Sequence, residues 1–166
     1  MVAAVTGVLM ERGGNLEDSA MTILGGHFAM MLIVEVGDEL TATDLERALA
    51  APAAQLGLTV AVRPTADAGR DEPVEGSGWS VSVHGADHPG IVHRVAKLLA
   101  DRGANIVDLS TRMVVAGDGS PPAYVLRLSV VVPRTTDAES LGAELVALAD
   151  ELQVEVRLRP DDADIL

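Results

Sequence analysis

The chain has 166 residues, no cysteine and a formal net charge of −13 at neutral pH. A cysteine-free chain excludes a disulfide framework, a cysteine metal site and a thiol nucleophile, and it fits a reducing compartment. Neither half of the sequence has a basic patch, so we expect no direct binding to nucleic acid or to a membrane surface. No stretch has the length of a membrane span or the form of a signal peptide, which predicts a cytoplasmic protein.

The sequence contains two copies of one repeat. Residues 2–18 match residues 92–108 at an offset of 90, and residues 45–64 match residues 141–160 at an offset of 96. Because 96 exceeds 90 by six, the second copy holds six extra residues, and the Gly- and Pro-rich loop 115–123 is the obvious place for them. Two small domains of the same fold explain the length of the chain.

In the first copy, apolar residues at helical spacing over 2–9 predict a helix that Gly13 ends. The strand predicted over 27–36 is apolar on both faces, so we expect its open face to be covered. A capping-box pattern that begins at Thr43 predicts the start of a second helix. The alternating stretch LTVAVRP predicts a last strand over 58–64.

The second copy predicts six elements in the order strand, helix, strand, strand, helix, strand. Its first strand is the alternating stretch WSVSV, and its first helix follows the breaker run GADHPG. The elements are a strand over 79–83, a helix from Ile91 to the stop at Gly103, strands over 105–115 and 123–132, a helix that begins at Thr136, and a strand over 154–160.

This order predicts an α+β fold with two tandem ferredoxin-like βαββαβ domains. Each sheet is expected to carry both helices on one face, because each helix has a single apolar stripe to bury. We place the first domain at 1–64, a linker at 65–77, the second domain at 78–160 and an acidic tail at 161–166. The uncovered sheet faces predict contact between domains or between chains, and hence a homo-oligomer.

The segment DHPGIVHRVAKLLADRGANIVDL, residues 87–109, resembles the signature of the ACT domain, a small βαββαβ module that binds amino acids and regulates metabolism. Both its D-x-P-G turn and its G-x-N-I motif are present. The resemblance covers nearly the whole chain as two tandem ACT domains, which is the layout of the glycine cleavage system transcriptional repressor family. Formyltetrahydrofolate deformylases and some phosphoserine phosphatases resemble this segment too, but they carry a catalytic domain that this sequence lacks.

The first copy lacks its first strand. Moving residues 79–90 back by the offset of 90 places their counterpart before Met1. In the ACT fold that strand lies inside the sheet, so its absence would leave unpaired backbone groups in the middle of the sheet. One hypothesis is that Met1 is an internal methionine and that translation starts roughly a dozen residues upstream. The alternative is that a partner chain supplies the strand, and the intact mass of the endogenous protein distinguishes the two.

The resemblance implies a ligand site at the turn after the first strand of the second copy. The implied ligand-binding residues are Asp87, His88, Pro89, Gly90, Ile91, Asn105 and Ile106. The free N–H groups of a helix N-terminus can hold an amino-acid carboxylate, and Gly90 lets a ligand approach the backbone. Asp87 and Asn105 would then bind the amino group or close the turn.

A purely structural interpretation competes with this site. In it, Asp87 caps the helix, Pro89 and Gly90 shape the turn, and Asn105 starts a strand. The first copy keeps only the end of the motif, with Asn15 and Leu16 as a possible vestigial counterpart, so at most one complete site is expected.

Other chemistry finds little support in the sequence. His84, His88 and His93 are close together along the chain, but they fall on a strand, a turn and a helix without the spacing of a zinc site. Ser110 and Thr111 have no evident base, and no nucleophile elbow or phosphate-binding glycine loop occurs. We therefore expect no catalytic residues, no metal and no cofactor.

The leading hypothesis is a non-enzymatic sensor that binds a small amino acid and acts through a protein partner. By resemblance, glycine and serine are the first candidate ligands and transcriptional regulation of glycine cleavage is the candidate process. One alternative is an interaction module that binds no small molecule, in which case amino acids would not affect partner binding. Another is a regulatory subunit or fragment of an enzyme of amino-acid or one-carbon metabolism, which would copurify with a catalytic chain.

Overall fold

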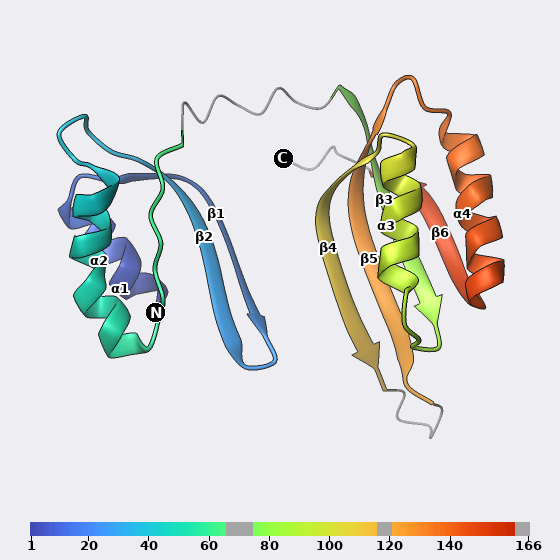
Figure 1. The fold of residues 1–166 in the computed structure, drawn as a ribbon, viewed down its shortest axis with the longest axis horizontal. Helices are drawn as coiled ribbons and strands as arrows, with labels where there is room; N and C mark the ends of the chain where they lie inside the picture. Colours follow the sequence, from blue (N-terminus) through green and yellow to red (C-terminus); the bar gives the residue numbers. More distant parts are fainter. Residues whose placement is uncertain (66–74, 116–120, 162–166) are drawn as a thin grey trace. The chain divides into compact units, whose positions relative to one another are not determined.

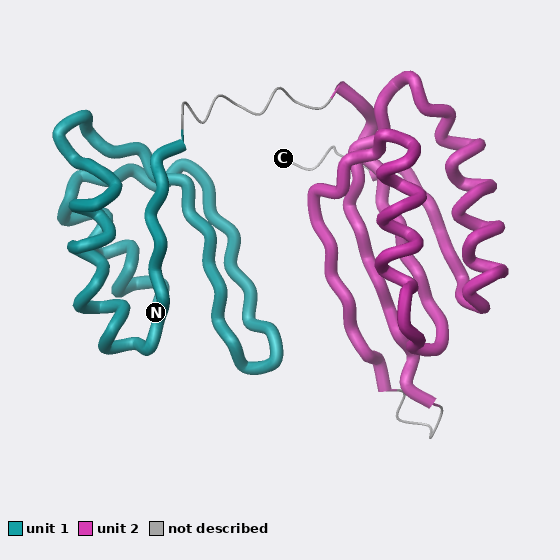
Figure 2. Tube along the Cα trace, viewed as in Figure 1, with its two compact units in different colours: residues 1–68 teal, residues 69–166 magenta. Residues whose placement is uncertain are grey.

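The computed structural model describes residues 1–65, 75–115 and 121–161. The chain forms two compact units, unit 1 over Met1–Ala68 and unit 2 over Gly69–Leu166 (Figure 2). Most of the predicted linker and of the acidic tail falls outside the described residues. The first strand of unit 2 begins at Gly76, two residues before the start that we predicted for the second domain.

Unit 2 has the predicted order of elements. They are β3 (Gly76–Gly85), α3 (Ile91–Asp101), β4 (Asn105–Val114), β5 (Ala123–Pro133), α4 (Ala138–Leu152) and β6 (Val154–Pro160). The strands form one four-stranded sheet in the order β4-β5-β3-β6, and all neighbours are antiparallel. Both helices cover one face of this sheet (Figure 1), which confirms the α+β, ferredoxin-like fold class.

The core of unit 2 lies between the sheet and its two helices. Alternate residues of β3 and β5 point toward the helices, and the apolar stripes of α3 and α4 meet them. The core positions with the least exposure are Val81, Val83, Ile91, Leu99, Leu126, Leu128, Val130, Leu141 and Leu145. Because β3 is in the middle of the sheet, its inward side chains lie at the centre of this core.

Unit 1 has only part of this fold. Its elements are α1 (Val2–Glu11), β1 (Asn15–Leu24), β2 (His27–Glu35) and α2 (Ala42–Leu56). The two strands form an antiparallel hairpin (Figure 1). The last strand that we predicted, over residues 58–64, is not formed, and this prediction was wrong. In unit 2 the equivalent strand pairs only with β3, so in unit 1 the strand lacks the neighbour that would hold it in a ladder.

The strand pairing of the two units follows the repeat. Asn15 pairs with Glu35 in unit 1, and Asn105 pairs with Val131 in unit 2. β1 and β4 also each have an irregularity after their second residue, at Leu16 in unit 1 and at Ile106 in unit 2. Bulges are local features of a strand pair, so their coincidence at the offset of 90 supports two copies of one fold.

The second helix of each unit begins at a different residue from the one predicted. Thr41, rather than Thr43, caps α2, and its hydroxyl accepts a hydrogen bond from the Asp44 backbone N–H at 3.2 Å. The hydrogen bond from the Thr41 hydroxyl is the main reason that the pKa of Asp44 lies below 3.8. Asp137, rather than Thr136, caps α4, and the Thr136 hydroxyl instead donates to the Arg102 carbonyl at 2.9 Å. None of the helices in the described ranges is long and apolar enough to span a bilayer.

Candidate functional site

The predicted ligand turn lies between the end of β3 and the start of α3. Gly85 ends β3 close to β6, where a Cβ atom would stand 2.7 Å from Cγ1 of Val154. Gly90 is the N-cap residue of α3 and has a φ of +100°, which favours glycine. The next residue, Ile91, is only 2% exposed and anchors the helix in the core. The turn itself is exposed at Asp87, Pro89 and Gly90 and half-buried at His88.

The N-terminus of α3 has no side-chain cap. No side-chain hydrogen bond caps the helix, and its first internal bond runs from the Arg94 N–H to the Gly90 carbonyl at 2.9 Å. The interpretation that Asp87 caps this helix is therefore wrong. The N–H groups of the first turn carry a partial positive charge and remain free for an anion. This turn can therefore hold a carboxylate beside the Asp87 side chain.

Tyr124 is a neighbour of the turn that the sequence did not indicate. It pairs with Gly85 across the β3–β5 ladder, and its side chain forms a hydrogen bond with Thr111. Burial raises the pKa of Tyr124 above 10.0, the negative charge of Asp87 raises it further, and the hydrogen bond with Thr111 opposes the rise. Only the pairing of distant strands brings Tyr124 to the turn, so no local motif could have identified it.

The phenol of Tyr124 gives a direct test of this arrangement, since Tyr124 is the one tyrosine in the chain. We expect Asp87→Asn to lower the pKa of Tyr124, although not fully to its ordinary value, because burial is the larger cause. The change is measured by phenolate absorbance against pH, with Asp101→Asn as a control. An identical titration curve in Asp87→Asn would contradict the proximity of the two groups.

The raised pKa of Tyr124 also predicts how stability depends on pH. The unfolded chain releases this proton near pH 10.0, and the folded chain releases it only at higher pH. The contribution to stability is therefore complete below about pH 10 and is lost as the pH rises through the folded pKa. Asp87→Asn should reduce the loss in this alkaline range and leave the neutral range unchanged.

The other part of the predicted site, Asn105 and Ile106, lies at the opposite end of the sheet. The turn follows Gly85, whereas Asn105 is in register with Gly78 through Val131 of β5. Gly85 lies seven positions after Gly78 along β3, which corresponds to about 23 Å. Figure 1 shows β3 ending at the lower edge of the sheet and β4 starting at the upper edge. The prediction of one site within a single domain needs this correction, because a small ligand cannot span that distance.

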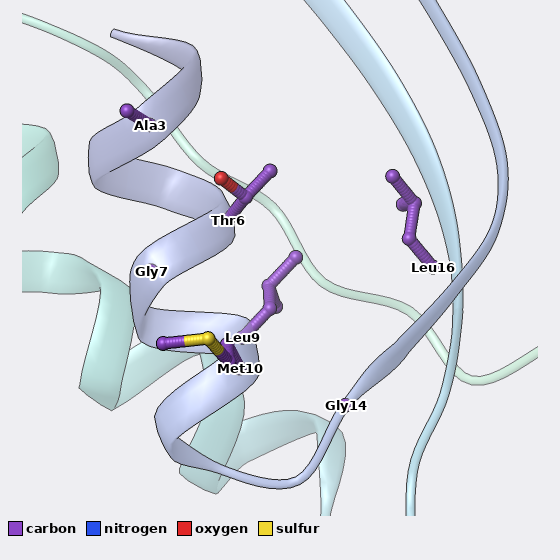
Figure 3. Close-up of a pocket in the computed structure, with 7 residues that line it drawn as sticks. All are labelled: Ala3, Thr6, Gly7, Leu9, Met10, Gly14 and Leu16. Carbon is purple, nitrogen blue, oxygen red and sulfur yellow. The ribbon is translucent and has the colours of Figure 1, made fainter.

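The counterpart residues in unit 1 lie beside a hollow of about 440 Å³ between α1 and the start of β1 (Figure 3). Leu16 lines the hollow, and Asn15 does not. The lining residues are Ala3, Thr6, Gly7, Leu9, Met10, Gly14 and Leu16. The Thr6 hydroxyl donates to the Val2 carbonyl at 3.1 Å. Because no lining residue is charged, this hollow lacks the groups that would bind both ends of an amino acid.

The histidines of the second unit remain separate. His84 is in the ladder of β3, His88 is in the turn, and His93 is exposed on α3. Within residues 1–65, 75–115 and 121–161, no group of three histidine or carboxylate side chains is placed to hold a metal ion.

Comparison with known proteins agrees with the fold and the repeat. Two models of the ACT domain match the chain, one over residues 1–63 and the other over residues 79–150. The chain is 26% identical over 155 residues to the glycine cleavage system transcriptional repressor of Escherichia coli strain K12. This match spans 93% of the chain and 80% of the repressor.

Two solved structures share the arrangement over almost the whole length. An uncharacterised protein from Galdieria sulphuraria is 26% identical, with a TM-score of 0.78 over 96% of this chain and 90% of that one. A protein proposed to be a glycine cleavage system transcriptional repressor is 19% identical, with a TM-score of 0.71 over 96% of this chain and 88% of that one. The second likeness shows the fold alone. The chain is thus a tandem ACT-domain protein, and it is related to the glycine cleavage system transcriptional repressor.

Proposed function

We propose that this chain is a non-enzymatic regulatory protein of the cytoplasm that senses a small amino acid and passes the signal to a protein partner. The observation that carries the proposal is the uncapped N-terminus of α3 beside the exposed carboxylate of Asp87. The similarity to a transcriptional repressor over 93% of the chain supports a regulatory role. Glycine and serine are the first candidates, because the related repressor is named for glycine cleavage.

In this proposal, the two charged ends of the amino acid meet complementary groups. The ligand carboxylate accepts hydrogen bonds from the N–H groups at the start of α3, where the helix dipole favours a negative charge. The ligand ammonium group binds the carboxylate of Asp87. Gly90 leaves the approach open, because nothing lies within 4 Å of the position that a Cβ atom would take.

Asn105 contributes to this site only from another domain or another chain, because it is at the far end of its own sheet. Val107 and Leu109 follow it on β4 and are 59% and 42% exposed, so this strand presents apolar surface for association. A ligand that bridges the turn of one domain and Asn105 of another favours the associated form. Amino-acid binding would then be coupled to the formation of a homo-oligomer.

The proposed signal reaches gene expression through a partner. The formal net charge of −13 opposes direct binding to DNA, so a DNA-binding protein or a metabolic enzyme would receive it. We propose the regulation of glycine cleavage as the process, on the basis of the related repressor.

Calorimetric titration of the purified chain with glycine and with serine tests the sensor. We expect saturable binding of one of them, and a weaker interaction in Asp87→Asn because the ammonium group loses its partner. Asp101→Asn makes the same change of charge at the other end of α3, away from the turn, and serves as the control. Absence of binding to both amino acids would contradict the proposed ligands, and partner binding without any amino acid would favour the interaction module.

A further inference from the structure

The sheet of unit 2 has one face that its helices do not cover. Both α3 and α4 lie on the other face (Figure 1), and the buried side chains of β3 and β5, such as Val81 and Leu126, point toward them. Side chains alternate along a strand, so Ser82 and the residues in register with it point the opposite way. We call the side that Ser82 occupies the open face.

The middle of the open face is a row of serine and arginine. Ser82 of β3 is in register with Arg127 of β5 on one side and with Arg157 of β6 on the other. Arg127 is in turn in register with Ser110 of β4. Because neighbouring strands lie about 4.8 Å apart, the backbones of the two arginines are about 10 Å apart. Both arginines are exposed and both serines are half-buried, so the row presents two guanidinium groups beside small hydroxyl groups.

Acidic side chains are absent from the two central strands. Neither β3 nor β5 contains an acidic residue, whereas Asp108 lies on the edge strand β4 and Glu155 on the edge strand β6. Arg157 pairs with Glu155 at 3.9 Å, but the two side chains are 60% and 78% exposed, so this pair is weak. Of the ion pairs between described residues, none involves Arg127. The centre of the open face therefore keeps a positive charge in a chain whose formal net charge is −13.

The repeat shows that the fold does not require these arginines. At the offsets of 90 and 96, three arginines of the open face correspond to neutral residues of unit 1, namely Arg112 to Thr22, Arg127 to Met31 and Arg157 to Ala61. Met31 is 72% exposed, so the matched position of β2 also faces away from the core. Arg159 corresponds to another arginine, Arg63. The same structural positions thus accept uncharged side chains, and the basic centre is particular to the second copy.

Charge and shape together indicate the kind of partner. Guanidinium groups bind carboxylates through parallel hydrogen bonds, and serine hydroxyl groups can donate further ones. Sites for small molecules are concave, whereas this row crosses the middle of a sheet and suits a surface or an extended segment. Single-stranded nucleic acid would need aromatic side chains for stacking, but Trp79 and Tyr124 pack against the core on the other face.

We propose that the open face of unit 2 binds a protein partner through a carboxylate-rich segment of that partner, with Arg127 and Arg157 as the central contacts. This inference rests on the proposed function, in which the chain acts through a protein partner, and it assigns the surface and the charge of that partner. Arg112 and Arg159 extend the contact on either side of the central row. None of these arginines belongs to the α3 turn, so the two sites can be tested separately.

The test titrates the 166-residue chain with a synthetic peptide of alternating glutamate and threonine. The peptide has about eight residues, which span about 26 Å when extended. We expect saturable binding at about 0.1 M salt, where the nearby arginines dominate, and its loss near 1 M salt, where charges are screened within about 3 Å. A matched peptide of glutamine and threonine should bind at least about tenfold more weakly. A thymidine oligonucleotide of the same length should also bind more weakly than the glutamate peptide.

Two double variants localise the binding. Arg127→Met together with Arg157→Ala places the residues of unit 1 on the open face and should weaken binding of the glutamate peptide at least about tenfold. Arg94→Ala together with Lys97→Ala removes the same charge from α3 and should leave this binding unchanged. The ion pairs that the control removes are exposed and contribute little to stability. The salt series and the glutamine peptide need no variant, so they decide the matter if a variant unfolds.

Equal binding of the two peptides, equal binding by the two double variants, or tighter binding of the oligonucleotide would overturn the proposal. Burial of the open face by self-association of the chain alone would overturn it as well and assign the face to a second copy. Titration with glycine and serine separates this inference from the proposed function, because Asp87 and Gly90 are unchanged in both double variants. Peptide binding without amino-acid binding would contradict the sensor and retain the docking face, and the reverse would retain the sensor and contradict the docking face.

Discussion

Leu126→Ala is expected to lower the free energy of unfolding of unit 2 by about 2–5 kcal/mol. Leu126 is 0% exposed in the middle of β5, and its neighbours are fixed by the sheet on one side and by two helices on the other. Removal of its side chain would leave a cavity that the surrounding residues can fill only in part. Denaturant unfolding measures this change through the fluorescence of Trp79, the one tryptophan in the chain. An unfolding midpoint equal to that of the unchanged chain would contradict the described core.

The repeat provides a matched comparison for this substitution. Met30 has the matched position in β2, but it lines an apolar groove of unit 1 and is only half-buried. Met30→Ala should therefore destabilise unit 1 by clearly less than Leu126→Ala destabilises unit 2, as measured by amide hydrogen exchange of β1 and β2.

Gly90→Leu is expected to weaken amino-acid binding by about 100-fold, which corresponds to about 2.7 kcal/mol. A Cβ atom at this position would have no atom within 4 Å, so the added side chain starts in open space at the start of α3. In the proposed function this is the space of the ligand. Calorimetric titration with glycine or serine, whichever binds to the unchanged chain, measures the loss.

The substitution also has a backbone cost, which requires a control. A residue other than glycine at a φ of +100° is strained, and about 1–2 kcal/mol of stability is expected to be lost. Gly57→Leu carries a similar strain at a φ of +66°, also with no atom near the added Cβ, but it lies in unit 1. Binding that survives in both variants would show that the ligand does not approach Gly90. Binding that is lost in both would point to a general loss of structure.

The fold could be predicted largely from local patterns. Alternation identified β3 and β6, helical spacing identified α3, and the repeat matched α1 of unit 1 to α3. The starts of α2 and α4 were misplaced because Thr41 and Asp137 stand close to other residues that could cap a helix equally well. The strand over 58–64 was wrong because a strand depends on its partner, and alternation in one segment carries no information about that partner.

The candidate site was harder to predict for a related reason. Asp87 and Asn105 are close in sequence, but α3 runs the length of the sheet between them and carries the chain to its other end. Tyr124 and Thr111 meet the turn only through the pairing of β3, β4 and β5. The spacing of two residues along the chain indicates their distance in space only when both lie in one helix or strand. For residues in different elements, the topology of the fold determines that distance.

The central place of β3 has a consequence for how the protein folds during its synthesis. β3 is the first strand of unit 2 to leave the ribosome, but its neighbour β6 is the last strand of that unit. Trp79 can therefore pair with Pro160 only after β6 has been synthesised. Contacts of such long sequence separation form slowly. In unit 1, by contrast, the hairpin joins neighbouring strands. The nascent second unit therefore keeps one edge of β3 unpaired until β6 has been synthesised, and this is the period in which it is most exposed to chaperones and to aggregation.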